Sequence, residues 1–139
     1  MEDTTASGVS LPDAASVPVS ILIVDDEPKN LAALEAILDD PGYRLIRATS
    51  GEEALLSMMA EEFALLILDV RMPGMSGFEV AQMVKERRKT ARIPIIFLTA
   101  YYNEDQHILE GYVSGAVDYL NKPVNTDQLL SLMRVWLFR

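Results

Sequence analysis

Several apolar runs in the sequence end at polar residues whose types are suited to chemistry on one ligand. Asp25 and Asp26 follow "ILIV", Asp69 ends "LLILD", Thr99 ends "IIFLT" and Lys122 lies in "LNKP". Carboxylates that lie together repel one another, and a hard divalent cation with oxygen ligands, such as Mg²⁺, offsets that repulsion. A lysine supplies a positive charge for a phosphate, and a threonine supplies a hydroxyl donor. A carboxylate nucleophile among such groups indicates phosphoryl transfer.

Each of these residues also has an ordinary structural role open to it. Asp26 could cap a following helix, and Asp69 could be a turn residue. Thr99 could be a plain strand residue, and Lys122 a solvated lysine before a proline. The chemical interpretation therefore rests on the joint pattern and not on any single residue.

The positions of these residues depend on a regular alternation of apolar runs and helically spaced segments. The predicted strands span 20–24, 43–48, 63–69, 94–99 and 116–120. The predicted helices span 28–40, 50–62, 77–88, 103–115 and 125–139. The first, third and fourth strands are continuously apolar, which indicates a parallel sheet covered on both faces. Because such crossovers are right-handed, the predicted fold is α/β, with an open doubly wound sheet.

The carboxyl ends of the strands are where a sheet of this kind binds ligands. The three aspartates, the threonine and the lysine all end or directly follow a predicted strand. They should therefore gather at one edge of the sheet, where the second strand offers only Ala48 and Thr49.

The composition indicates one folded domain and excludes several classes of protein. The chain has 139 residues, half of them hydrophobic, and no cysteine for disulfides or thiolate metal sites. No apolar run approaches the roughly 20 residues that cross a bilayer, and the acidic start is unlike a signal peptide. We therefore expect no membrane contact and a cytoplasmic location. Residues 1–19 are predicted to be a disordered leader before a domain spanning 20–139.

The charge balance argues against a surface for nucleic acid. The formal net charge is −9, so no nucleic-acid binding by this domain is expected. The basic stretch "KERRKTAR" (85–92) is interpreted as a solvated helix end, where cations are favourable.

Four motifs together resemble a known family. "ILIVDDE", "LLILDVRMPGMSGFEV", "IIFLTA" and "GAVDYLNKPV" occur in the order and spacing of a CheY-like response-regulator receiver domain of two-component signalling. The resemblance covers residues 20 to about 138. It implies a flavodoxin-like fold with five helices and a five-stranded sheet of order 2-1-3-4-5. It also implies a phosphorylation-activated switch that catalyses only its own phosphorylation and dephosphorylation.

The resemblance assigns a role to each residue of the site. Asp69 matches the phosphoacceptor. Asp25 and Asp26 match the acidic pair that holds Mg²⁺ together with Asp69 and the backbone carbonyl of Arg71, and the second acid of that pair usually contacts the ion directly. Lys122 matches the lysine that pairs with a phosphoryl oxygen.

The resemblance also implies a switch beside the site. Thr99 matches the hydroxyl that turns toward the phosphoryl group, and Tyr119 matches the aromatic residue that fills the space left behind. The Lys122–Pro123 peptide bond is expected to be cis, at the modest cost of an X–Pro bond.

The implied partners are a phosphoryl donor and a target. The donor is a histidine kinase or a histidine phosphotransfer protein. The target is an output domain or a second copy of the chain, bound through the face formed by 103–115, 116–120 and 125–139. A receiver-like interaction module that does not depend on phosphorylation is the remaining alternative.

Three other functions fit the sequence less well. An aspartyl-phosphate hydrolase of the haloacid-dehalogenase type needs an aspartate two residues after the first, where this chain has Arg71. A P-loop ATPase needs G-x-x-x-x-G-K-[ST], which is absent. The single histidine, His107, lacks the surroundings of a phosphodonor and is interpreted as a surface helix residue.

The last helix carries more apolar residues than one buried stripe requires. The residues spaced to cover the sheet are Leu129, Leu132, Met133 and Trp136. Leu130, Leu137 and Phe138 are predicted to lie partly off that face. They are either a fraying terminal turn or a contact surface for a second copy or a following module.

Overall fold

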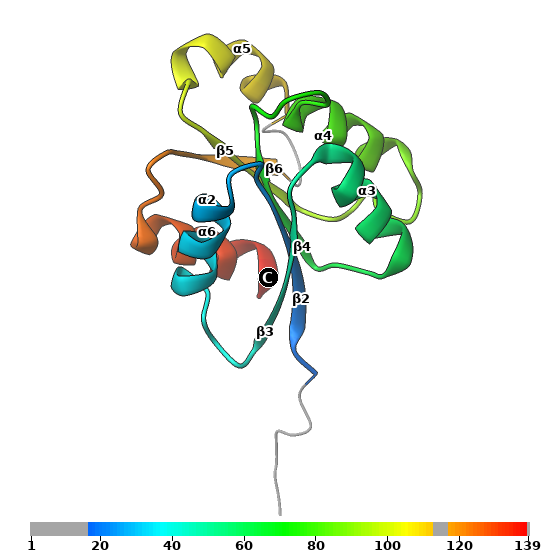
Figure 1. Ribbon diagram of the computed structural model, residues 1–139, viewed down its shortest axis with the longest axis vertical. Helices are drawn as coiled ribbons and strands as arrows, with labels where there is room; N and C mark the ends of the chain where they lie inside the picture. Colours follow the sequence, from blue (N-terminus) through cyan, green and yellow to red (C-terminus); the bar gives the residue numbers. More distant parts are fainter. Residues whose placement is uncertain (1–16, 113–116, 139) are drawn as a thin grey trace, which may run out of the picture.

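The computed structural model describes residues 17–112 and 117–138, in which a central sheet lies between two layers of helices (Figure 1). The strands are β2 Val19–Val24, β3 Tyr43–Ala48, β4 Leu65–Asp69, β5 Ile95–Thr99 and β6 Val117–Asn121. The helices are α2 Pro28–Ile37, α3 Gly51–Ala60, α4 Gly77–Glu86, α5 Tyr102–Tyr112 and α6 Thr126–Leu137. Each of the ten predicted segments has a counterpart, and the predicted positions 113–116 and 139 lie outside the described residues. The predicted leader lies outside the described residues, apart from its last three positions, and Val19 already begins β2.

The sheet confirms the predicted topology. Its strand order is β3-β2-β4-β5-β6 and every pair is parallel, which is the order 2-1-3-4-5 when strands are counted along the chain. The register places Asp69 beside Leu98 and Thr99 beside Asn121. The carboxyl ends of the strands therefore meet at one edge, as the site requires.

The continuous apolar runs are explained by burial on both faces of the sheet. Alternate residues of each strand point to opposite faces, so each face has its own core. The strand residues facing α2 and α6 include Ile21, Ile23, Leu65, Ile67, Ile96 and Leu98. Those facing α3, α4 and α5 include Leu22, Val24, Leu66, Leu68, Ile95 and Phe97. Figure 1 shows α2 and α6 together on one side of the sheet and α3 with α4 on the other.

Helix starts agree with the predictions because their signals are local. Ser50 caps α3 by accepting a hydrogen bond from the backbone N–H of Glu53 at 3.1 Å. Ser76 and Glu79 form a reciprocal capping box at the start of α4. Asn125 caps α6 by accepting a hydrogen bond from the backbone N–H of Gln128 at 2.9 Å.

Helix ends were predicted too late at α2, α3 and α4, and α3 ends at Ala60 and not at residue 62. Helix α2 ends at Ile37 and not at residue 40, since the Asp40 carboxylate accepts from Gly42 N–H at 2.6 Å in a turn. Helix α4 ends at Glu86 and not at residue 88, because the buried Thr90 hydroxyl donates to the carbonyl of Val84 at 2.6 Å.

The basic stretch 85–92 is only partly the solvated helix end that was predicted. Its two consecutive arginines and Lys89 are exposed. Lys85 instead folds back, and its ammonium donates to the carbonyls of Ala91 and Ile93 at 3.2 and 2.9 Å. These two hydrogen bonds help close the α4–β5 connection, and burial there lowers the pKa of Lys85.

The prediction for the last helix needs a correction. Leu129 and Met133 are fully buried, and Leu130 and Leu137 also pack against the same core from the edge of the helix. Of the three residues predicted to lie off that face, Phe138 alone is largely exposed, at 65%. The proposed apolar patch on this helix is therefore reduced to its final turn.

Gly77 is the glycine on which the geometry of the site depends. It begins α4, and its N–H donates to the carbonyl of Val70 at 2.8 Å. A Cβ atom at this position would lie 2.2 Å from the carbonyl oxygen of Asp69. The absence of a side chain lets α4 begin directly against the end of β4.

Substitution of Gly77 should therefore destabilise the fold and displace Asp69. We expect Gly77→Ala to lower the free energy of unfolding by about 2 kcal/mol or more, the range typical of forced overpacking. Gly74→Ala is the comparison, because Gly74 has φ +75° but open space around it, and its backbone strain costs about 1 kcal/mol. Urea unfolding measures both variants. Equal losses of stability in the two variants would show that the close contact between Gly77 and the backbone of Asp69 adds no cost of its own.

Candidate functional site

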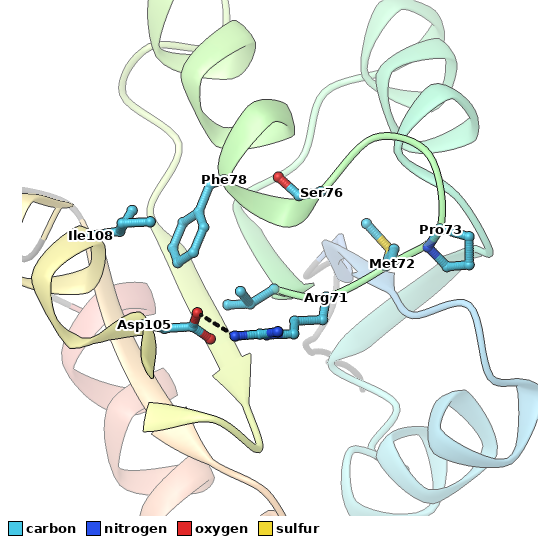
Figure 2. Close-up of a pocket in the computed structure, with 8 residues that line it drawn as sticks. Arg71, Met72, Pro73, Ser76, Phe78, Asp105 and Ile108 are labelled. Carbon is cyan, nitrogen blue, oxygen red and sulfur yellow. Dashed lines mark hydrogen bonds and ion pairs between the residues drawn. The ribbon is translucent and has the colours of Figure 1, made fainter. Parts of the chain in front are cut away.

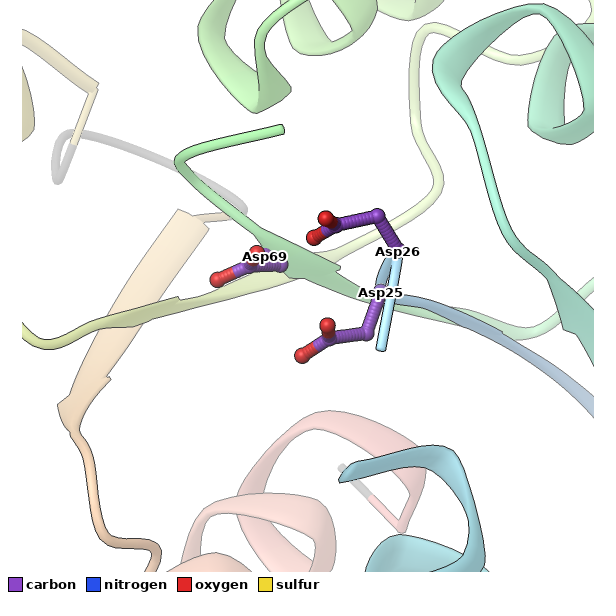
Figure 3. A group of neighbouring side chains, drawn as sticks. All are labelled: Asp25, Asp26 and Asp69. Atoms are coloured by element: carbon purple, nitrogen blue, oxygen red, sulfur yellow. The ribbon is translucent and has the colours of Figure 1, made fainter. Parts of the chain in front are cut away.

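Three aspartates meet at the carboxyl-terminal edge of the sheet. Asp25 and Asp26 directly follow β2, and Asp69 is the last residue of β4. Ligand oxygen atoms of the three carboxylates all lie within 4.8 Å of one another, and Figure 3 shows the three side chains pointing the same way. Asp25 and Asp69 are buried, whereas Asp26 is partly exposed. The predicted gathering of acids is present in the structure.

Lys122 joins this cluster from beyond β6. Its ammonium nitrogen lies 2.8 Å from Asp69 Oδ1 and 2.9 Å from Asp25 Oδ2. The Lys122–Pro123 peptide bond is cis, as expected, and the backbone N–H of Lys122 donates to the carbonyl of Thr99 at 2.8 Å. The lysine thereby neutralises part of the acidic charge.

The carboxylate of Asp25 already has several partners. Its Oδ1 accepts from Glu27 N–H at 2.9 Å, and its Oδ2 accepts from Asn30 Nδ2 at 3.2 Å as well as from Lys122. Asp26 does not cap α2, because the N-cap is Glu27, whose side chain makes no capping bond. Within residues 17–112 and 117–138, no hydrogen bond to the Asp26 carboxylate is found. Asp26 is therefore the acid whose two carboxylate oxygens are both open to a ligand.

Burial raises the pKa of Asp69 to about 6. The hydrogen bond from Lys122 offsets part of that effect, while the charges of Asp25 and Asp26 raise the pKa further. Burial lowers the pKa of Lys122, but its hydrogen bonds to Asp69 and Asp25 outweigh burial and raise it above the ordinary value. When ionised, the three carboxylates thus carry more negative charge than the single ammonium group of Lys122 offsets.

The donor set fits a hard divalent cation. Buried carboxylates with one partly exposed member offer oxygen ligands only, which is the chemistry that Mg²⁺ prefers. One lysine beside three carboxylates leaves a net negative charge that such a cation would offset. The acidic cluster could therefore bind a metal.

Thr99 lies at the same edge, but its hydroxyl belongs to a different network. Thr99 is buried, and its hydroxyl donates to Asp105 Oδ2 at 3.0 Å and accepts from Tyr101 N–H at 2.9 Å. Asp105 also pairs with Arg71 Nη2 at 3.1 Å. Asp105 could not be recognised from the sequence, because an acid in the first turn of a helix is common and carries no further signal.

Tyr119 packs on the side of the sheet that faces α3, α4 and α5. It lies on β6, half-buried, and its ring stacks on that of Tyr102 with the centroids 5.1 Å apart. This stack joins β6 to the first turn of α5, the face where the switch was predicted. His107 is exposed on α5, in agreement with its interpretation as a surface residue.

The fold and the site together define a class of protein, the two-component receiver domains. The family described as response regulator receiver domain matches residues 21–134. The chain belongs to this family, and the sequence resemblance is thereby confirmed.

The relatives include both regulators and kinases. The chain is 41% identical over 121 residues to the transcriptional regulatory protein YvrH of Bacillus subtilis, a match that covers 86% of this chain and 49% of that protein. It is 33% identical over 130 residues to the sensor protein GacS of Pseudomonas syringae, covering 90% of this chain and 14% of that one. The chain thus spans about half or less of these curated relatives.

A solved structure of similar shape contains the predicted metal. The receiver domain of a sensor histidine kinase from Pseudomonas aeruginosa holds a magnesium ion in its active-site cleft. It has a TM-score of 0.79 and 27% identity, covering 88% of this chain and all of that one.

Among the described residues, no helix has the length and apolar character needed to cross a membrane.

The raised pKa of Asp69 predicts a stabilising substitution. The native state binds a proton at Asp69 that the unfolded chain has released, so stability falls as pH rises from about 4 to 6. In metal-free buffer at pH 7, we expect Asp69→Asn to increase the free energy of unfolding by about 1–2 kcal/mol, after allowance for partial solvent access. The gain should vanish near pH 4.

Thermal unfolding across pH 4 to 8 measures this effect. Asp39→Asn, at an exposed acid after α2, is the matched control and should leave the profile unchanged. A destabilised Asp69→Asn variant at pH 7 would show that Asp69 ionises without cost in the folded protein.

Proposed function

We propose that this chain is a phosphorylation-activated signalling switch in which Asp69 accepts the phosphoryl group. The observation that carries the proposal is the position of Asp69. It is a buried carboxylate at the end of β4, 2.8 Å from Lys122 and beside two further acids. Since its pKa is about 6, Asp69 is mainly ionised at neutral pH and is available as a nucleophile.

The proposed protein donor carries its phosphoryl group on a histidine nitrogen. A carboxylate oxygen of Asp69 attacks the phosphorus of a phosphohistidine, and the P–N bond breaks as the acyl phosphate bond forms. The imidazole keeps the electron pair and takes a proton from solvent. Lys122, already paired with Asp69, lies where it can meet the negative charge of the phosphoryl oxygens.

The residues proposed to hold Mg²⁺ are Asp25, Asp26, Asp69 and the backbone carbonyl of Arg71. Asp26 would bind the ion directly, because both of its carboxylate oxygens lack a competing hydrogen-bond partner among the described residues. When bound, the ion supplies charge stabilisation for the phosphoryl group. Asp25 contributes by fixing Lys122 and the start of α2.

The partners follow from the class of protein. The donor is a histidine kinase or a histidine phosphotransfer protein. The target is an output domain or a second copy that reads the face of α5, β6 and α6, where Thr99 and Tyr119 report the state of Asp69. We propose a cytoplasmic domain over residues 20–139, preceded by a leader, without enzymatic activity beyond its own phosphorylation and dephosphorylation.

Phosphorylation at Asp69 should be directly observable. With a small acyl phosphate donor and Mg²⁺, we expect the intact mass of the wild type to increase by one phosphoryl group. Asp69→Asn should show no increase, because an amide is not a nucleophile toward phosphorus. Asp39→Asn, the matched control, should be labelled like the wild type. An unchanged adduct in Asp69→Asn would refute the assignment.

Magnesium should stabilise the native state selectively. A ligand at ten times its dissociation constant adds about 1.4 kcal/mol to the free energy of unfolding when it binds only the folded protein. Asp26→Ala should abolish this gain. Denaturation at matched ionic strength, with NaCl replacing MgCl₂, separates binding from general screening. A wild-type stability indifferent to millimolar Mg²⁺ would contradict the proposed metal site.

A further inference from the structure

The hydroxyl of Thr99 is already committed in this structure. It carries one proton, and that proton is donated to Asp105 Oδ2 at 3.0 Å. Both residues are at least 95% buried, so water does not compete for this bond. A hydroxyl cannot donate to Asp105 and to a phosphoryl oxygen on Asp69 at the same time.

Asp105 is held in place from two further sides. Its Oδ1 accepts from Arg71 Nη2 at 3.1 Å, the contact drawn in Figure 2. The guanidinium carbon of Arg71 lies 4.3 Å from the centroid of the Tyr101 ring, a cation–π contact. The backbone N–H of Asp105 donates to the carbonyl of Tyr101 at 2.9 Å, in the first turn of α5. The carboxylate is thus a rigid acceptor.

These contacts connect three elements. Arg71 lies two residues after Asp69, Thr99 ends β5, and Asp105 belongs to α5. Tyr102 in the same turn of α5 stacks on Tyr119 of β6. Loss of the Thr99–Asp105 bond would therefore loosen the first turn of α5 from β5, next to the face proposed to be read by a target.

We infer that Asp105 is a positioning residue that holds the Thr99 hydroxyl away from Asp69 and so sets the resting equilibrium of the switch. This inference rests on the proposed function of Asp69. A phosphoryl group must draw the Thr99 hydroxyl away from a buried, charged acceptor, and that competition weakens every ligand that needs the hydroxyl. Hydrogen bonds to charged acceptors are stronger than those to neutral acceptors. The competition with Asp105 should therefore weaken the binding of such a ligand by on the order of tenfold.

The test uses beryllofluoride with saturating Mg²⁺ as the probe, titrated by calorimetry on the full chain. Asp105→Ala removes the competing acceptor and should lower the dissociation constant about tenfold. Glu104→Ala is the matched control, because it removes the neighbouring exposed acid of the same helical turn and should change nothing. A purely structural role for Asp105 would instead weaken binding or leave it unchanged.

A double-mutant cycle shows whether the effect passes through Thr99. In a Thr99→Ala background, Asp105→Ala should no longer tighten binding, because there is no hydroxyl to release. Thr99→Ser restores a hydroxyl and should restore the gain. If Asp105→Ala does not fold, Asp105→Asn keeps the size of the side chain and should tighten binding several-fold through the lost charge.

The outcomes distinguish this inference from the proposed function. If the wild type does not bind beryllofluoride, or binds it no more tightly than Asp69→Asn does, the proposed function fails. If the wild type binds through Asp69 but Asp105→Ala and Asp105→Asn bind no more tightly, the positioning role of Asp105 is wrong. An equal gain with and without the Thr99 hydroxyl would also overturn it.

Discussion

The burial of an ionisable carboxyl group at the end of a dry strand is the constraint on which the rest of the site depends. Every residue of β4 is buried, and Asp69 is its last member. Ionisation there is unfavourable unless positive charge is brought to it. Because β5 separates β4 from β6, a long side chain has to cross the width of one strand, and Lys122 does so. The lysine leaves the cluster negative, which suits a divalent cation and a phosphoryl group together.

The same sheet edge carries a second polar network, and the hydroxyl of Thr99 belongs to this network and not to the carboxylate cluster. Thr99, Asp105 and Arg71 form a chain of hydrogen bonds on the α5 side of the site. Arg71 links the two, since its backbone follows Asp69 closely while its side chain reaches Asp105. A change of charge at Asp69 therefore has a physical connection to α5, which runs through packed and hydrogen-bonded groups.

The sequence predicted those features that depend on local pattern and on the topology of parallel sheets. The apolar runs located the strands, and the rule that ligands bind at their carboxyl ends brought Asp25, Asp69 and Lys122 together. The ends of α2 and α4 were misplaced, because they depend on turn contacts and on Thr90 folding back onto the helix. Asp105 could not be recognised, since its role depends on a side-chain contact across 34 residues of sequence with Arg71.

The most direct test of the central claim is chemical mapping of the phosphoryl linkage. An acyl phosphate on an aspartate is reduced by borohydride to homoserine, which marks the residue in a peptide mass spectrum. After phosphorylation in Mg²⁺, the account predicts homoserine at position 69 and at no other acidic position. Labelling of Asp25, Asp26 or another acid, or a stable phosphate on Thr99 or His107, would contradict it.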